Sequence, residues 1–483
     1  MYSHECAGMQ SSHHMMKNHI LPSINQGNTY LALADPSTMG SAFAYGKHHA
    51  KYGLLFHERG LRVFITTANY ISCDLVDLTN AVYVQDFPLQ KKDNTLTVHV
   101  NTEFEDELTS FFKHLSANMK LGEETRNGVN KMVSRLKDYD FSSAECDLIL
   151  AVPGHHKNDH LSRYGQKRVN HILKSNRDSE TMSDNFLDAK VISNTSEPLT
   201  LACKRHGVAL QHSSFASLGQ SGEFLNDLCG SNGFSPFNQN PEIQLIWPTY
   251  QTIIESVLGI SSGGSIPADR KNFYDKSNNF VVNIQRALRR WDGTPTGRKH
   301  VVAHMKCYFG YSYFDRDYDN NGNKYVVDLT SPTLSPVSRK RPRGEPSVTK
   351  DHTKQSMIKF KLYQQPESDH IDIDWIILTS SNVSKAAWGV LQKQNTQLYM
   401  RSYEMGVMFM PNKIKSTKRR FSLTPSHPLF GLGMNDESQH SASTHGGAQD
   451  NIVRLDVPFK FPADRYVIEG PNQDIPWMTS TST

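Results

Sequence analysis

The sequence of 483 residues contains only six cysteines, and they are widely scattered. None of them forms a CxxC pair, which argues against a zinc module or a disulfide scaffold and fits a reducing intracellular compartment. No apolar run reaches the length of a membrane-spanning helix, and the first residues, MYSHECAGMQSSHHMMKNH, are too polar for a secretory signal. These features exclude the secreted disulfide-rich and membrane-spanning classes.

A large excess of charge is also absent. The chain has 52 Lys and Arg against 48 Asp and Glu, a formal net charge of +4. Such a balance permits a nucleic-acid partner without requiring one, so local motifs matter more than the total. Hydrophobic residues make up 37% and charged residues 21%, as in ordinary globular proteins, and the length is sufficient for two domains.

Strand-like apolar runs alternate along the chain with segments of helical periodicity, which predicts an α/β fold. Two stretches rich in polar, charged or proline residues, 315–356 and 413–450, are predicted to be flexible insertions. The predicted strands lie within 61–71, 146–154, 243–248, 300–314, 373–382 and 397–411, and the predicted helices within 103–116, 251–259 and 279–291.

An internal repeat is the most informative feature. HAK at 49–51 is followed by FITTAN at 64–69, and HMK at 304–306 is followed by ILTSSN at 377–382. Each copy is His-x-Lys on an apolar run, then a second apolar run that ends in Asn. The simplest physical explanation is a duplicated half-site.

Strand geometry predicts that the histidine and lysine of each copy share a face, since residues i and i+2 project to the same side. His48 would then point away from His49 and serve a structural role. Two facing half-sites would supply two imidazoles, two ammonium groups and two amides to a phosphorus centre. One histidine can attack phosphorus while the other protonates the leaving oxygen and later takes a proton from water.

These residues resemble the phospholipase D superfamily, whose usual HxK motif is followed by Asp. Phe56 and Tyr311 occupy those positions here, and the later Asn69 and Asn382 are typical of the tyrosyl-DNA phosphodiesterase branch. The resemblance implies two similar α/β/α sandwich halves with mixed sheets, related by a pseudo-two-fold axis, with the active site in the cleft between them. We expect the halves at 1–163 and 164–483, the first being short at its amino end and exposed to instability through an unpaired sheet edge.

The resemblance further implies a hydrolase that needs no metal or other cofactor and removes a topoisomerase I tyrosyl peptide from a DNA 3′ end. His49 would be the nucleophile and His304 the general acid and base. Glu404 would orient His304, and Asn80, where a glutamine is expected, would orient His49. The groups expected to bind the phosphoryl oxygens are Lys51, Lys306, Asn69 and Asn382. The DNA-side contacts implied by the family are Tyr45, Ser214, Ser217, Ser384, Lys385 and Ala386.

Several alternatives stay open. The serines among the DNA-side residues could simply cap turns or helices. The chain could be another phosphodiesterase or nuclease of the superfamily, or a DNA-binding protein with weak or no activity. The stretch DYDNNGNKYVVD at 317–328 mimics a calcium loop, but Lys324 and the final Asp328 depart from that pattern. The basic run SRKRPRG at 338–344 could direct nuclear import. We expect a nuclear monomer without a membrane partner.

Overall fold

The structure is a computed structural model, and it describes residues 48–90, 101–118, 123–179, 190–192, 200–219, 221–235, 241–315, 371–411, 413, 420–422, 452–454, 459–468 and 470–479. Contacts divide the chain into one unit of residues 1–181, 206–311 and 371–483 and another of residues 182–205 and 312–370. All candidate site residues that the structure describes fall in the first unit. The boundary predicted at 163/164 stays a prediction. The predicted insertions lie almost wholly outside the described residues.

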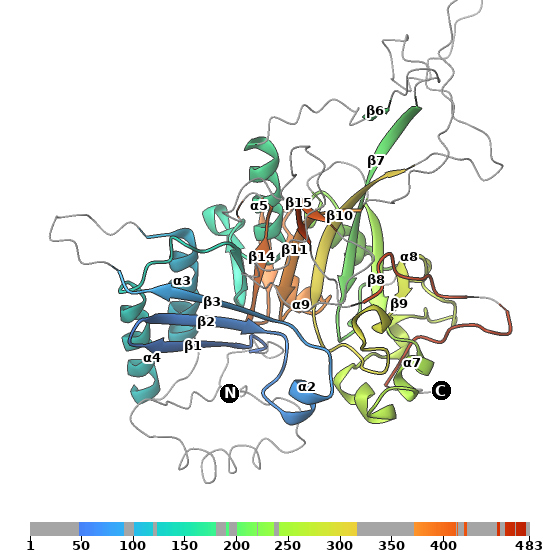
Figure 1. Cartoon of the computed structure of the whole chain (residues 1–483), viewed down its shortest axis with the longest axis horizontal. Coiled ribbons are helices and arrows are strands. Elements are labelled where there is room, and N and C mark those ends of the chain that lie inside the picture. Colours follow the sequence, from blue (N-terminus) through green and yellow to red (C-terminus); the bar gives the residue numbers. More distant parts are fainter. Residues whose placement is uncertain are drawn as a thin grey trace, which may run out of the picture. The chain divides into compact units, whose positions relative to one another are not determined.

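Strands form three sheets, one of them mixed, which confirms the predicted α/β class with mixed sheets (Figure 1). The sheets have the orders β1-β2-β3, β16-β15-β11-β10-β7-β8-β9 and β12-β13-β5. In the largest sheet β14 pairs with both β11 and β4, and β6 pairs with β7. The strands are β1 Tyr52–His57, β2 Gly60–Thr66, β3 Val82–Pro88, β4 Asp147–Ala151, β5 Gly154–Lys157, β6 Lys190–Ile192, β7 Thr200–Gln211, β8 Glu242–Trp247, β9 Leu288–Arg290, β10 Cys307–Asp315, β11 Asp372–Thr379, β12 Val390–Gln392, β13 Gln397–Met400, β14 Glu404–Phe409, β15 Arg420–Ser422 and β16 Ile452–Arg454.

The helices of the described residues are mostly short, apart from three of about four turns. They are α2 Ser72–Val76, α3 Glu103–Asn118, α4 Glu123–Leu136, α5 Gly165–Ser179, α6 Glu223–Cys229, α7 Tyr250–Ile254, α8 Val282–Ala287 and α9 Lys385–Trp388. Where helical periodicity predicted one helix over 279–291, the chain forms α8 and then β9, because Leu288–Arg290 pairs in parallel with β8. Tertiary pairing outweighs the local helical pattern there.

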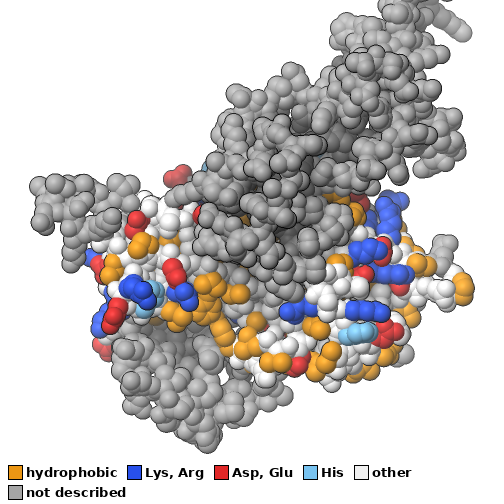
Figure 2. Space-filling model, in the orientation of Figure 1, with side chains coloured by type: hydrophobic (Ala, Val, Ile, Leu, Met, Phe, Trp, Pro, Cys, Tyr) orange, Lys and Arg blue, Asp and Glu red, His pale blue; other side chains and the backbone are white. Residues whose placement is uncertain are grey.

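The small antiparallel sheet β1-β2-β3 buries one face against α3. Tyr52 lies 5.9 Å from Phe111 and 5.3 Å from Phe112 between ring centroids, and Phe87 lies 5.3 Å from Phe104. On the other face Leu55, Val82 and Val84 are more than half exposed. Figure 2 shows hydrophobic and charged side chains mingled over this region.

The largest sheet carries the main hydrophobic core. Trp388 at the end of α9 is fully buried and packs against Phe234 at 4.7 Å and Tyr308 at 5.5 Å between ring centroids. Trp247 on β8 is also fully buried, and its indole Nε1 donates to the carbonyl oxygen of Trp477. This core includes Tyr308 of β10 and Trp375 of β11, which both pack against Phe234. Since β10 follows HMK and β11 leads to Asn382, the core supports the second half-site.

Neither HxK segment lies on a strand, contrary to the prediction. HAK at 49–51 ends one residue before β1, and HMK at 304–306 ends one residue before β10. The reason is that consecutive amides in each segment bond to a single carbonyl oxygen, which a regular ladder does not allow. Among the described residues, no helix is long and apolar enough to cross a membrane.

Candidate active site

Matching backbone hydrogen bonds hold the two HxK segments. The amides of His49 and the residue after it donate to the carbonyl oxygen of Tyr403, at 2.9 and 3.1 Å. The amides of His304 and the residue after it donate to the carbonyl oxygen of Thr79, both at 3.0 Å. Tyr403 and Thr79 are therefore equivalent positions, and each supports the segment that lies far away in the sequence.

The repeat continues into the Asn-ended strands. The amide of Thr66 donates to the carbonyl oxygen of Lys51 at 2.9 Å, and the amide of Thr379 donates to that of Lys306 at 3.2 Å. The hydroxyl that follows accepts a backbone amide in both copies. Thr67 Oγ1 accepts from the amide of residue 81 at 3.0 Å, and Ser380 Oγ accepts from that of residue 405 at 3.1 Å. These matched bonds confirm the duplicated half-site.

His49 is paired with a buried carboxylate. Its Nδ1 lies 2.9 Å from Oε2 of Glu404, which also accepts a hydrogen bond from Ser380 Oγ at 2.5 Å. The pair fixes the imidazole so that Nδ1 carries the proton and Nε2 keeps its lone pair. About a quarter of the His49 side chain remains exposed, so its free nitrogen can meet an incoming group.

His304 is paired with a carboxylate that the sequence reasoning missed. Its Nδ1 lies 3.0 Å from Oδ2 of Asp74, on the short helix α2. Asp74 is completely buried, and the same oxygen accepts the backbone amide of Asn69 at 2.7 Å. The sequence signal that could have indicated it is that Asp74 lies five positions after Asn69, the first Asn of the repeated pattern, in NYISCD. Sequence spacing alone gave no reason to prefer it to other carboxylates.

The predicted partners of the two histidines were therefore wrong. Glu404 orients His49 instead of His304, because the residue before it bonds the backbone of the first HxK segment. Asn80 does not contact His49: its Nδ2 donates to the carbonyl oxygen of Asp74 at 2.7 Å, and its Oδ1 accepts from Thr67 at 2.8 Å. In each case the backbone contacts between distant segments decide which side chain reaches which imidazole.

Both lysines are buried, as the predicted phosphate site requires. Lys51 is 6% exposed and Lys306 is 0% exposed. Each ammonium group donates to the carbonyl oxygen of its own histidine, at 2.6 Å for Lys51 and 2.7 Å for Lys306. Two ammonium groups in a desolvated site create a strong preference for an anion.

Burial and positive charge keep both imidazoles neutral. Burial lowers the pKa of His49 to about 4, although the Glu404 carboxylate raises it. Burial and then Lys306 lower the pKa of His304 to about 3, against the opposing effect of Asp74. For Asp74 burial favours the neutral acid, but the bond with His304 outweighs it, so the pKa of this carboxyl is lowered. The carboxylates are ionised and the imidazoles neutral near pH 7.

Asn382 connects the second half-site to the segment 213–217. Its Oδ1 accepts the backbone amides of Ser213 at 3.0 Å and Ser214 at 3.1 Å. Those bonds fix the orientation of the amide, so its NH₂ group is the part that can donate to a phosphoryl oxygen.

The other predicted DNA-side residues lie beyond Asn382, except for two. Ser384 accepts the amide of Ala387 at 3.2 Å as the N-cap of α9, so it has at least the structural role weighed from the sequence. Lys385 Nζ lies 5.8 Å from the ring centroid of Phe224, and the carbonyl oxygen of Ala386 accepts the amides of residues 401 and 402. Ser217 is exposed. Tyr45 lies outside the described residues.

His48 behaves as predicted for a structural residue. Its ring packs 5.8 Å from that of Tyr403 and 6.1 Å from that of Tyr52, between centroids, and burial lowers its pKa to about 4. Within the described parts of the chain, no three His, Cys, Asp or Glu side chains are grouped so that they could hold a metal ion.

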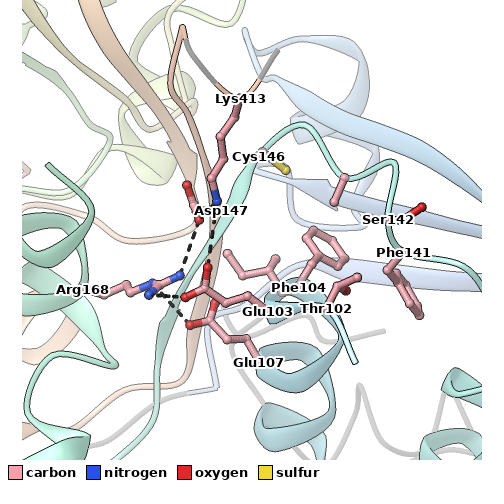
Figure 3. A pocket seen from close by; sticks show the side chains of 12 residues that line it. Thr102, Glu103, Phe104, Glu107, Phe141, Ser142, Cys146, Asp147, Arg168 and Lys413 are labelled. Atoms are coloured by element: carbon pink, nitrogen blue, oxygen red, sulfur yellow. Dashed lines mark hydrogen bonds and ion pairs between the residues drawn. The ribbon is translucent and has the colours of Figure 1, made fainter. Parts of the chain in front are cut away.

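A second group of charges lies at the other end of β4 and β14. Ala151 pairs with Glu404, whereas Asp147, at the start of β4, pairs with Met408. Asp147 lines a pocket of about 130 Å³ together with Glu103, Glu107, Arg168 and Lys413 (Figure 3). Four residues of strand, about 13 Å, separate Asp147 from Ala151, the residue that pairs with Glu404. This group of charges is therefore a feature distinct from the candidate active site.

A solved structure shares the fold of this protein. The structure resembles the crystal structure of yeast tyrosyl-DNA phosphodiesterase with a TM-score of 0.52 at 14% identity, over 90% of this chain and 78% of that chain. Together with the mixed sheets and the duplicated half-site, this similarity identifies a phospholipase D-like fold. The model of the tyrosyl-DNA phosphodiesterase family matches residues 34–467, and the chain belongs to that family.

The curated relatives that the chain resembles are also named as tyrosyl-DNA phosphodiesterases. The chain is 27% identical over 454 residues to tyrosyl-DNA phosphodiesterase 1 of Arabidopsis thaliana, a match that covers 90% of this chain. It is 24% identical over 404 residues to a probable tyrosyl-DNA phosphodiesterase of Caenorhabditis elegans, with 81% of this chain covered. The chain spans 59% of the length of the plant relative and 67% of the nematode one.

Proposed function

We propose that this protein hydrolyses the bond between a topoisomerase I tyrosine and a DNA 3′ phosphate and leaves a 3′-phosphate end. The observation that carries the proposal is the pair of equivalent half-sites, each with a histidine bonded through Nδ1 to a buried carboxylate and a buried lysine beside it. Membership of the tyrosyl-DNA phosphodiesterase family supports the choice of substrate.

In the first step Nε2 of His49 attacks phosphorus and forms a phosphohistidine bond, while the bond from phosphorus to the tyrosine oxygen breaks. His304 gives a proton to that oxygen, so the peptide leaves as a neutral phenol. Lys51, Lys306 and the amide of Asn382 stabilise the charge that develops on the other phosphoryl oxygens.

In the second step His304, now neutral, takes a proton from water. The water oxygen attacks phosphorus, and the bond to His49 Nε2 breaks, which releases the 3′-phosphate and restores the first imidazole. Each histidine needs a fixed tautomer for these roles, and a carboxylate on Nδ1 provides it. The mechanism uses imidazole, ammonium, amide and carboxylate groups of the chain.

Substrate binding raises the proton affinity of His304. Burial and Lys306 lower the pKa of His304 to about 3, so the free imidazole is neutral and is not yet an acid. An anionic phosphodiester placed between the two lysines raises that pKa, because opposite charge favours the imidazolium. Substrate binding is therefore accompanied by proton uptake at His304.

On the DNA side, Ser214, Ser217, Lys385 and the amide region of 384–386 would bind the backbone, which positions a strand without reading its sequence. Tyr45 would contribute from the segment before the first HxK. Work on DNA supports a nuclear location, and the basic run at 338–344 would serve import. We expect a monomer to suffice because both half-sites lie in one chain.

The test is a single-turnover assay with a 3′-phosphotyrosyl oligonucleotide. Wild-type protein should release the 3′-phosphate product, and His49→Ala should give neither product nor covalent adduct. His304→Ala should give an adduct that decays slowly, since the base for water is lost. Cleavage by His49→Ala at the wild-type rate would refute the assignment.

Two controls separate this activity from the alternatives. Phosphatidylcholine and an unmodified single strand should not be turned over, whereas hydrolysis of either in preference to tyrosyl-DNA would indicate another phosphodiesterase. EDTA should leave the rate unchanged. Tight binding of the oligonucleotide with no adduct under any condition would instead indicate a DNA-binding protein without activity.

A further inference from the structure

The two half-sites differ at one equivalent position. Glu404 follows Tyr403, whose carbonyl oxygen supports the first HxK segment, and its carboxylate reaches His49. Asn80 follows Thr79, whose carbonyl oxygen supports the second HxK segment, but it carries an amide. The position that should provide the acid for His304 therefore has no carboxylate.

Asp74 fills this role from another element. It projects from α2, is completely buried, and places Oδ2 3.0 Å from His304 Nδ1. Asn80 holds the helix that carries it, since its Nδ2 donates to the carbonyl oxygen of Asp74 at 2.7 Å. The other end of the Asn80 amide accepts the hydroxyl of Thr67, at 2.8 Å. The amide is thus fixed at both ends.

We propose that Asp74 is the positioning residue of His304 and that Asn80 braces it, so that this pair does for the second histidine what Glu404, bonded by Ser380, does for the first. Asp74 holds the proton on Nδ1 of His304 and leaves Nε2 to exchange protons with the tyrosine oxygen and with water. This inference rests on the proposed function, because it assigns a task within the same reaction.

A purely local role for Asp74 is the competing explanation. Its Oδ2 also accepts the amide of Asn69, so the carboxylate could simply stabilise the turn before α2. The two roles differ in what they control. A turn stabiliser affects folding and the phosphate contacts, whereas a positioning residue sets the tautomer and pKa of His304 and the steps that depend on its proton.

Three variants distinguish these roles in single-turnover assays. Asp74→Ala removes the acceptor, and decay of the phosphohistidine adduct should slow about 100-fold or more, the usual worth of general acid-base catalysis. Asp74→Ala combined with Asn80→Glu supplies a carboxylate from the position equivalent to Glu404, and should recover at least about tenfold of that loss, because general acid-base catalysis returns with the aligned imidazole. Asn80→Ala alone should have a smaller effect with the same pattern.

The leaving group provides a second readout. When 4-nitrophenyl replaces tyrosyl on the 3′ phosphate, departure needs little acid. Adduct formation by Asp74→Ala should then approach the wild-type rate, while adduct decay stays slow. Equal impairment of both steps with both leaving groups would indicate a structural role and overturn the proposal.

Asp74→Asn keeps an oxygen acceptor but removes the charge, so it covers the case in which the alanine variant does not fold. His304 is faced by Asp74 from α2, by Lys306 from its own segment and by Lys51 from the first half-site. Loss of the Asp74 charge should move the pH midpoint of adduct decay to lower pH. An unchanged midpoint, with a normal unfolding temperature, would overturn the proposal.

Failure of the proposed function would look different. If wild-type protein forms no adduct with tyrosyl-DNA, the activity is refuted, but the pairing can still be measured. The ¹⁵N shifts of the His304 imidazole should report a proton on Nδ1 in wild type and a mixed or reversed tautomer in Asp74→Ala. Identical shifts in the two proteins would refute the positioning role by itself.

Discussion

Glu107 provides a test of the structure that does not depend on any activity. It lies on α3, is 5% exposed, and its Oε1 lies 3.3 Å from Nε of Arg168. Its other oxygen accepts no hydrogen bond within the described residues. Burial raises the pKa of Glu107 to about 8, the Arg168 charge opposes that rise, and the nearby Glu103 and Asp147 carboxylates add to it. We predict that Glu107→Gln stabilises the protein at high pH.

The sign follows from proton binding. Between pH 4.5 and 8 the folded protein holds a proton on Glu107 that the unfolded chain has released, so the free energy of unfolding falls as pH rises. A rise in pKa from 4.5 to about 8, at 1.36 kcal/mol for each unit, corresponds to about 5 kcal/mol in full and about 3 kcal/mol at pH 7. Gln cannot ionise and escapes this loss.

Urea denaturation of both proteins at pH 4.5, 7 and 8.5 measures the effect. The two free energies of unfolding should agree at pH 4.5, and the variant should gain over wild type as pH rises, by several kcal/mol at pH 8.5. Glu103→Gln is the matched control from the same helix. Burial opposes ionisation of Glu103 but the hydrogen bond with Arg168 outweighs it and lowers its pKa, so this variant should lose stability at neutral pH. A constant difference between Glu107→Gln and wild type at every pH would refute the reasoning.

The remaining predictions concern the site and the core. Glu404→Gln keeps an oxygen acceptor for His49, so adduct formation should slow only about tenfold. Glu404→Ala should slow it about 100-fold, and both effects lie within the range for a hydrogen bond to a charged group. Single-turnover rates measure both effects, and a larger effect of Gln than of Ala would contradict the prediction. Binding of 3′-phosphotyrosyl DNA to His49→Ala at pH 6.5 should take up a measurable fraction of a proton at His304, whose pKa burial lowers to about 3 in the free protein and the bound anion raises. Calorimetry in buffers of different ionisation enthalpy measures that uptake, and none would refute the proposed acid. Trp388→Ala should lose about 3–5 kcal/mol of stability in urea titrations, because the buried indole packs against Tyr308; a loss below 1 kcal/mol would contradict this packing.

Much of the site was predictable because it is repeated. HxK and a later Asn form a local pattern, and two copies of it in one chain identify His49, His304 and their lysines without any knowledge of the fold. The burial of β4 was also predictable, since its continuous apolar run from Leu148 to Ala151 is typical of a fully buried strand. The short elements around α8 and β9 were not, because pairing with β8 overrides their helical periodicity.

The sequence by itself determined the groups of the candidate site, namely two imidazoles, two ammonium groups and two amides in equivalent order. Only the tertiary structure decided which carboxylate serves which histidine. Glu404 reaches His49 because its neighbour Tyr403 bonds the first HxK segment, and Asp74 reaches His304 from a helix of five residues. Those contacts join residues far apart in the chain or on separate elements, and the distance between two side chains is set by tertiary backbone contacts and burial, which spacing along the sequence does not encode.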